Sequence, residues 1–269
     1  MTRMQKPSGF TLVELAIVLV IIGLIVGGVL TGSDLIKAAT IRSTVSDFEK
    51  YNAGATTFQS KYNGLPGDLK ASKAVEFNLS GAADTNATGL AGLRDGNGAI
   101  EGGSANATNL IGEIGLFWKD LGAVGLIGGT YTATGTTVTT GANVTAATIG
   151  SYLPRTRLRE NTNHFVYAVD GKNFFYLASI ATVVGAAVTT GSAVTALEAK
   201  AVDEKMDDGF PTSGIVLSMT DLTTPDAGAT QTTSTCMNGT VAPKVYNVTT
   251  AAAGAPDAQV CQLRLRTSF

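Results

Sequence analysis

The chain has 269 residues, of which 44% are apolar and only 15% are charged, and its formal net charge is −2. This length suits one large or two small domains. A mildly acidic chain lacks the overall basic character of dedicated nucleic-acid-binding proteins, so the composition argues against nucleic acid as the main partner.

The first element is an apolar run, Gly9–Leu30, that follows a polar leader carrying Arg3 and Lys6 and no acid. A helix from Phe10 to Leu30 would be about 31 Å long, enough to cross a bilayer core of roughly 30 Å. A secretory signal would be followed by a cleavage site of small residues, and no such site follows Leu30. The run therefore predicts a transmembrane helix.

One carboxylate, Glu14, lies inside this apolar run. A charge within a membrane helix is costly and usually has a functional partner, so a plain anchor does not explain it. Cleavage between Gly9 and Phe10 would create a new amine one helical turn from Glu14. We expect Glu14 of one copy to neutralise the Phe10 amine of the next copy.

The segment Gly9-Phe10-Thr11-Leu12-Val13-Glu14 resembles the processing motif of bacterial type IV pilins and type II secretion pseudopilins. The resemblance implies cleavage after Gly9 by a prepilin peptidase, N-methylation of Phe10 and a carboxylate at the fifth mature position, Glu14. Many type IVa pilins carry a proline near the twenty-second mature position, where this chain has Thr31. The partners implied are other copies of the chain, the peptidase/methyltransferase and an inner-membrane assembly platform.

The helical pattern continues beyond the membrane segment to Tyr62. Apolar residues recur at steps of three and four, which predicts one buried face of an amphipathic helix. Asn63-Gly64 supplies a left-handed C-cap, and Pro66 bars continuation. The apolar face is formed by Leu35, Ala38, Ile41, Val45, Phe48, Tyr51, Ala55, Phe58 and Tyr62.

The predicted fold is α+β: a long N-terminal helix whose second half packs on an antiparallel β-sheet head, the lollipop arrangement of pilins. Its expected parts are a leader (1–9), the helix (10–62, with 10–30 transmembrane) and a globular head (63–269). The clearest signal in the head is a hairpin, 164–169 and 173–178, around an Asp-Gly turn. Helices are expected at 109–121 and 193–206, a strand at 215–219 and an edge strand at 258–265.

The two cysteines, Cys236 and Cys261, are expected to form one disulfide in a head outside the cytoplasm. No enzyme is predicted, since the sole histidine, His164, begins a strand and has no nucleophile near it in sequence. Alternating Arg155, Arg157 and Arg159 would present three cations on one face of a strand, toward DNA phosphate, toward a neighbouring subunit or toward solvent.

A calcium site is the alternative to simple turns in the loops of the head. Asp84 opens an EF-hand-like spacing that reaches Asp95, and Asp95, Asn97 and Glu101 offer oxygens among glycines. Major pseudopilins bind calcium in a head loop, so the resemblance favours the same cation here. Asp, Asn and Gly also make ordinary turns, and both interpretations stay open.

The sequence thus predicts a prepilin that polymerises into a type IV pilus-like filament. It would reside in the inner membrane with its head in the periplasm, and after assembly in an extracellular or periplasmic filament. The alternatives are a pseudopilin of a type II secretion system and a minor pilin that acts as an adhesin or DNA-capture module.

Overall fold

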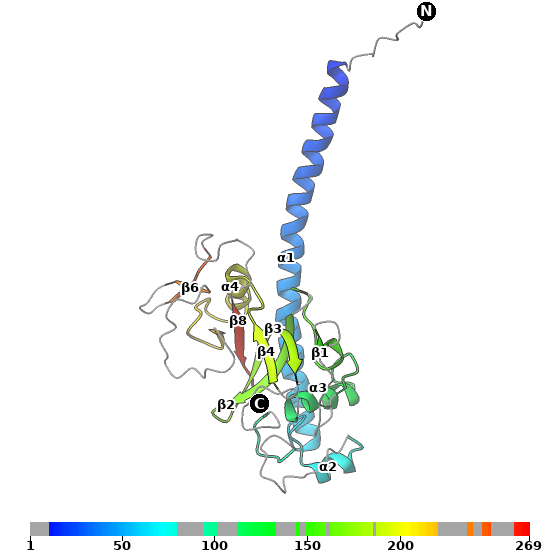
Figure 1. The fold of residues 1–269 in the computed structure, drawn as a ribbon, viewed down its shortest axis with the longest axis vertical. Helices are drawn as coiled ribbons and strands as arrows, with labels where there is room; N and C mark the ends of the chain where they lie inside the picture. Colours follow the sequence, from blue (N-terminus) through cyan, green and yellow to red (C-terminus); the bar gives the residue numbers. More distant parts are fainter. Residues whose placement is uncertain are drawn as a thin grey trace, which may run out of the picture. The chain divides into compact units, whose positions relative to one another are not determined.

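The computed structural model describes residues 11–79, 94–101, 112–132, 144–145, 149–159, 162–184, 187–219, 236–238, 244–248 and 261–269. By contacts the chain divides into two compact units, 1–40 and 41–269. The fold is α+β, as predicted, with a long N-terminal helix and an antiparallel sheet (Figure 1).

Helix α1 runs from Leu12 to Tyr62 without interruption. Its end coincides with Asn63, which adopts a positive φ of 54° as the predicted left-handed cap. The predicted apolar face is buried from Ile41 onward, at Phe48, Tyr51, Ala55, Phe58 and Tyr62, whereas Leu35 is exposed. The second half of the helix therefore belongs to the core of the second unit.

The predicted hairpin forms the centre of the sheet. Strands β2 (Thr162–Val169) and β3 (Lys172–Val184) pair from Val169↔Lys172 to Thr162↔Ser179. Asp170 and Gly171 between them have φ values of 51° and 71°, as a two-residue turn of the favoured hairpin type requires.

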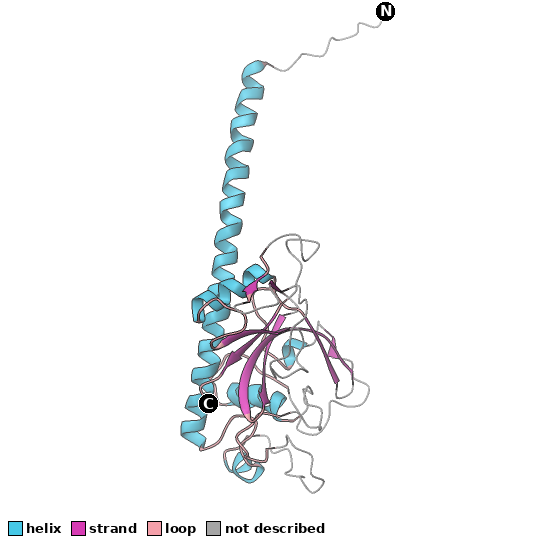
Figure 2. Cartoon of the chain, turned by 90° about the vertical axis from the view of Figure 1, so that its left-hand side faces the viewer, coloured by secondary structure: helices cyan, strands magenta, loops and turns pink. Residues whose placement is uncertain are grey.

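Four strands complete the sheet, in which β3 is the central strand (Figure 2). Strands β1 (Val144–Thr145), β4 (Ala187–Gly191) and β8 (Gln262–Arg266) pair with β3, and β5 (Val216–Met219) pairs with β8. The expectation that the C-terminal strand lies at an edge was wrong, because β8 lies between β3 and β5. Its burial pattern, with Leu263 and Leu265 buried, is that of an inner strand.

The disulfide between Cys236 and Cys261 is present and confirms the predicted pairing. It connects β8 to a two-stranded sheet formed by β6 (Met237–Asn238) and β7 (Val245–Tyr246). Because these strands have only two residues each, a covalent link compensates for their few ladder hydrogen bonds.

Three shorter helices surround the sheet: α2 (Ala71–Glu76), α3 (Glu113–Ala123) and α4 (Ala196–Met206), and a 3₁₀ turn, η2, covers Ile149–Ser151. Thr195 and Glu198 form a capping box at the start of α4, which explains why this helix begins three residues after the predicted Ala193. Helix α3 is buried on several sides, including Ile114, Phe117, Trp118 and Leu121.

An aromatic cluster joins the second half of α1 to the sheet and to α3. The Tyr51 ring lies 4.9 Å from that of Trp118, and the Phe48 ring lies 6.2 Å from that of Phe175, centroid to centroid. Aromatic pairs at such distances add to the burial of apolar area. The cluster is the core on which the head is built.

Candidate functional site: the N-terminal segment and the carboxylate cluster of the head

The structure describes the N-terminal segment from Thr11 onward, and the predicted processing residues Gly9 and Phe10 lie outside the described residues. Every residue from Thr11 to Leu30 is exposed, including Leu12, Leu19 and Leu24, which are 85%, 70% and 73% exposed. A continuous apolar surface of this size requires lipid or another protein to cover it.

Glu14 forms the first cap of α1. Its Oε2 accepts hydrogen bonds from the Thr11 backbone N–H (2.8 Å) and from the Thr11 hydroxyl (2.9 Å). The Glu14 N–H donates to the Thr11 hydroxyl oxygen at 3.3 Å, which completes a capping box. The Thr-x-x-Glu spacing in the sequence is the signature of this capping box.

Helix α1 passes straight through Thr31, where a proline would have removed a backbone donor. The Thr31 hydroxyl donates to the Gly27 carbonyl at 3.1 Å, a bond within the helix that satisfies the hydroxyl in an apolar surrounding. In this described part of the chain the helix therefore stays regular at Thr31.

Among the described helices, α1 is the one long and apolar enough to cross a membrane, with a window of mean hydropathy 2.8 that is not buried in the protein. The prokaryotic N-terminal methylation motif matches residues 4–30. The N-terminal segment therefore carries the motif that defines prepilin-like proteins of the type IV pilin and pseudopilin family. No curated protein and no solved structure matches the chain.

The motif points to a structural subunit, and with the apolar helix it supports anchoring in a membrane before assembly. It also implies processing by a prepilin peptidase. The motif covers the N-terminal segment and does not extend into the head.

In the head, three carboxylates converge from separate segments. Asp68 comes from the loop after α1, Asp95 from the loop 94–101 and Glu113 from the first turn of α3, and their ligand oxygens lie within 4.8 Å of one another. Asp68 and Glu113 are buried. Such a cluster has the composition of a site for a hard cation.

Backbone N–H groups hold the cluster in place. Asp68 accepts from the N–H of Gly96 (2.7 Å) and of Gly98 (2.8 Å) through its two oxygens. Glu113 accepts from the N–H of Asp95 (3.3 Å) and of Glu101 (3.0 Å). Gly96 and Gly98 have positive φ values of 73° and 89°, which explains why glycine stands at both positions.

Burial and mutual repulsion favour the protonated forms of these acids. Desolvation, which outweighs the bonds from Gly98 and Gly96, raises the pKa of Asp68 to about 6. Desolvation and the charge of Asp68 raise the pKa of Glu113 to about 9. At neutral pH without a cation, Glu113 therefore retains its proton.

Of the residues predicted to bind calcium, Asp95 lies in the carboxylate cluster, whereas Asn97 and Glu101 lie beside it in the same loop. Asp95 also accepts hydrogen bonds from the backbone and the side-chain amide of Asn97, each at 3.0 Å. Asn97 in turn accepts from the Ala99 N–H, and its amide lies 3.5 Å from Glu101. Asp84 lies outside the described residues.

Asp68 and Glu113, the partners of Asp95, were not predicted from the sequence. Asp68 closes the Leu65-Pro66-Gly67-Asp68 phrase, and Glu113 lies 18 residues beyond Asp95. No local spacing connects the three residues. The one available signal was an acid inside the apolar pattern of the predicted helix 109–121.

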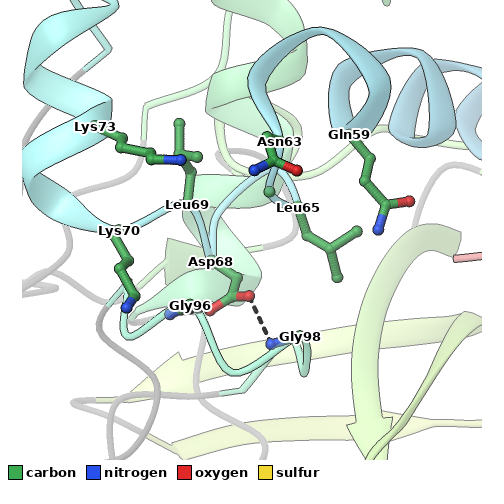
Figure 3. A pocket seen from close by; sticks show the side chains of 10 residues that line it. Gln59, Asn63, Leu65, Asp68, Leu69, Lys70, Lys73, Gly96 and Gly98 are labelled. Carbon is green, nitrogen blue, oxygen red and sulfur yellow. Dashed lines mark hydrogen bonds between the residues drawn. The ribbon is translucent and has the colours of Figure 1, made fainter.

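A cavity of about 260 Å³ opens beside Asp68 (Figure 3). Gln59 and Asn63 from the end of α1, Lys70 and Lys73 next to and within α2, and the Gly96–Gly98 loop line it. The aliphatic part of the Lys70 side chain lies against Gly96. A Cβ atom at position 96 would collide with the side-chain carbons of Lys70. The lysines place positive charge at the mouth, next to the acids.

A second group of acids, Asp203, Asp207 and Asp208, surrounds the end of α4. Asp203 accepts from the Gly209 N–H (3.1 Å) and the Tyr246 hydroxyl (2.8 Å), and Asp207 accepts from the Ile215 N–H. Desolvation raises the pKa of Asp203 to about 6. These acids tie the 209–215 turn and β7 to α4, which is a structural role.

The predicted arginine face on a strand is not formed. Within residues 149–159, Arg155 makes an isolated bridge to Asn163, and the segment contains no strand. Arg159 lies 3.2 Å from Glu198, and Arg264 stacks over the Phe174 ring at 4.3 Å. The arginines therefore act mainly within the head.

Proposed function

We propose that the chain is a structural subunit that is cleaved after Gly9, is N-methylated at Phe10 and polymerises through α1 into a type IV pilus-like filament. The observation that supports this most is the combination of the methylation motif with a helix exposed over all of residues 11–30. Lipid covers this surface before assembly, and neighbouring copies cover it afterwards.

Glu14 sets the register in this proposal. In the single chain its carboxylate already lies at the N-terminus of α1, where it accepts the hydrogen bond of the Thr11 N–H. A protonated Phe10 amine of the next copy offers a bond in which both partners are charged, whereas the Thr11 donors that it replaces are neutral groups. Exchanging a local cap for this contact would be favourable only when the two helices lie at the correct offset.

Glu14→Ala tests the proposal, and Thr11→Ala is its matched control. Both variants lose the capping box, but only Glu14→Ala loses the carboxylate. We expect Glu14→Ala to reduce sedimentable filaments tenfold or more, since a bond to a charged group contributes roughly 1.5–3 kcal/mol. Thr11→Ala should assemble nearly normally, and both should be processed, as mass spectrometry of the N-terminus would show. Normal filaments from Glu14→Ala would contradict the mechanism.

The proposed life cycle begins in the inner membrane with the head in the periplasm. A prepilin peptidase/methyltransferase and an assembly platform act on the chain before it enters the filament. Whether the filament is a pilus or a secretion pseudopilus, with the chain as major or minor subunit, would follow from its abundance in purified filaments. A tip-bound adhesin or DNA-capture subunit would occur only in traces.

We also propose calcium as a ligand of the head, bound by Asp68, Asp95 and Glu113 with Asn97 and Glu101 as neighbouring oxygen donors. The supporting observation is the convergence of three carboxylates, two of them buried. Calcium coordinates several oxygens, and the loop also brings backbone carbonyls. Because Glu113 has a raised pKa, calcium must displace its proton, so affinity should increase with pH.

Thermal unfolding of the full chain in detergent with and without calcium tests this second proposal. At a calcium concentration of a hundred times Kd, binding would add about 2.7 kcal/mol to the free energy of unfolding. Asp95→Asn should remove the effect, whereas Asp208→Asn in the other acidic group should leave it. No stabilisation at millimolar calcium would rule out calcium as the ligand.

A further inference from the structure

The head exposes apolar side chains at the C-terminal end of α2. Val75 is 64% exposed, and Phe77, the C-cap residue, is 41% exposed while one side of its ring packs on Tyr62 at 4.9 Å. Lys73 and the exposed Glu76 accompany them. We call Lys73, Val75, Glu76 and Phe77 the α2 tip.

The head also carries an apolar groove of about 290 Å³ between α1, the end of α4 and the β5–β8 edge of the sheet. Its apolar lining consists of Phe48, Phe175, Met206, Ile215 and Leu265. Three charged side chains surround it: Glu49, Lys205 and Arg266. Ile215, at the mouth, is 42% exposed although it is aliphatic.

The α2 tip and the groove lie at different levels along α1. The tip touches α1 at Tyr62, whereas the groove borders it at Glu49, thirteen residues earlier and so about 20 Å along the helix axis. Figure 1 likewise shows α2 and α4 at separate ends of the head. The tip cannot enter the groove of its own chain.

The charges of the two surfaces are complementary. The tip carries one cation, Lys73, and one acid, Glu76, while the groove offers one acid, Glu49, and two cations, Lys205 and Arg266. Among the described residues, the ion pairs of the head join other side chains and include none of these five. Opposite charges around an apolar centre favour one orientation of a partner and raise its association rate.

We propose that the α2 tip of one copy docks into the groove of the next copy, with Val75 and Phe77 on the apolar lining, Lys73 toward Glu49, and Glu76 toward Lys205 and Arg266. Two different surfaces meet, so the contact is head-to-tail, and such contacts propagate into open helical filaments when they do not close into rings. The inference rests on the proposed filament and adds to it a contact between heads, displaced along α1.

Cysteine crosslinking in the assembled full chain tests this contact. The variant Val75→Cys/Ile215→Cys places one thiol on each surface, at exposed positions where substitution has little effect on folding. Mild oxidation should yield a ladder of covalent trimers and longer oligomers, since each chain joins two neighbours. A closed two-fold contact would stop at dimers and would overturn the proposal.

The matched control is Val75→Cys/Leu197→Cys. Leu197 is also an exposed aliphatic residue of the head, 65% exposed, but it lies at the opposite end of α4 from Met206, about 13 Å away along that helix. This variant should give no ladder. Equal ladders from both variants would show collision rather than docking and would overturn the proposal.

A charge exchange provides the second measurement. Glu76→Lys should weaken the ladder of the Val75→Cys/Ile215→Cys chain several-fold, and adding Lys205→Glu should restore it. Sedimentable filaments without a ladder would refute the contact but leave the proposed function intact. If no filament forms from the unmodified chain, the proposed function fails, and the contact fails with it.

Discussion

At the scale of single residues, buried polar groups determine how the head responds to pH. His164 of β2 is fully buried against α1, with its ring 4.6 Å from that of Phe48 and 5.2 Å from that of Tyr51. Neither ring nitrogen has a hydrogen-bond partner in the described residues. Desolvation lowers the pKa of His164 to about 3. The sequence predicted a residue at the start of a strand, but His164 is the third residue of β2 and belongs to the buried core.

One acid faces this ring. A carboxylate oxygen of Asp47 in α1 lies 4.0 Å from the Nε2 of His164. Desolvation raises the pKa of Asp47, and the nearby charges of Lys50 and Arg157 oppose only part of this shift. The pKa of His164 is lowered despite this neighbour, because desolvation of the buried imidazole is its cause. His164 therefore stays neutral in the folded protein over most of the acidic range.

The first prediction concerns acid stability. In the unfolded chain His164 takes up a proton below about pH 6.5, whereas in the fold it does so only near pH 3. Its contribution is present above pH 6.5 and is lost as the pH falls toward 3, by at most about 1.4 kcal/mol per pH unit. His164→Phe should remove this loss.

Urea unfolding of both proteins between pH 7 and 4 measures the effect. Asp68 and Asp203 have raised pKa values of about 6, so their contributions act in the opposite direction and increase as the pH falls. The informative quantity is the difference between variant and parent at each pH, in which those contributions cancel. A difference that does not change with pH would contradict the assignment.

At the scale of elements, one buried ion pair connects three segments of the head. Arg94 and Asp120 are 0% and 1% exposed and lie 2.6 Å apart. Asp120 of α3 also accepts the Gly67 N–H at 2.8 Å, and Arg94 reaches the Leu69 carbonyl at 3.4 Å. The pair thus joins α3 and the loop 94–101 to the turn after α1, and these segments carry the carboxylate cluster.

The second prediction is that Asp120→Ala destabilises the head by about 3–5 kcal/mol, because it leaves the Arg94 charge buried without its counterion. Lys200→Ala is the control, since it removes an exposed pair with Glu204 at 3.3 Å on α4, which contributes about 0.5 kcal/mol or less. Denaturant unfolding of the full chain in detergent measures both. Similar losses from the two variants would contradict this account.

At the scale of the whole molecule, the two compact units of the chain differ in whether their apolar residues are exposed or buried. Residues 11–40 belong to one compact unit and residues 41–269 to the other. The first exposes its apolar residues and the second buries them, so each needs a different solvent or partner. Cleavage after Gly9 is proposed as the step that moves the first unit from lipid to filament.

The third prediction concerns this step. Substituting Gly9 by a bulky residue, as in Gly9→Leu, should block cleavage, because a peptidase that fits glycine has no room for a branched side chain. The full-length chain should then accumulate in the membrane, as immunoblots of membrane fractions would show. Gly28→Leu, nineteen residues from the proposed cleavage site, is the control for processing. Mature protein from Gly9→Leu would contradict the prediction.

The N-terminal segment and its methylation motif could be recognised from the sequence without the structure. The signals there are local: a contiguous motif at residues 4–30, apolar residues in a run and a cap at Asn63. The Asp-Gly hairpin and the disulfide were predictable for the same reason, since a turn is encoded in neighbouring residues and two cysteines allow one pairing.

The carboxylate cluster, the inner position of β8 and the groove became visible only in the tertiary structure. Asp68, Asp95 and Glu113 are 27 and 18 residues apart and meet because α3 and the loop 94–101 pack beside the end of α1. A strand at the C-terminus looks like an edge until another strand, here β5, is found beside it. Contacts between distant segments depend on how elements pack, which no periodicity within one segment reports.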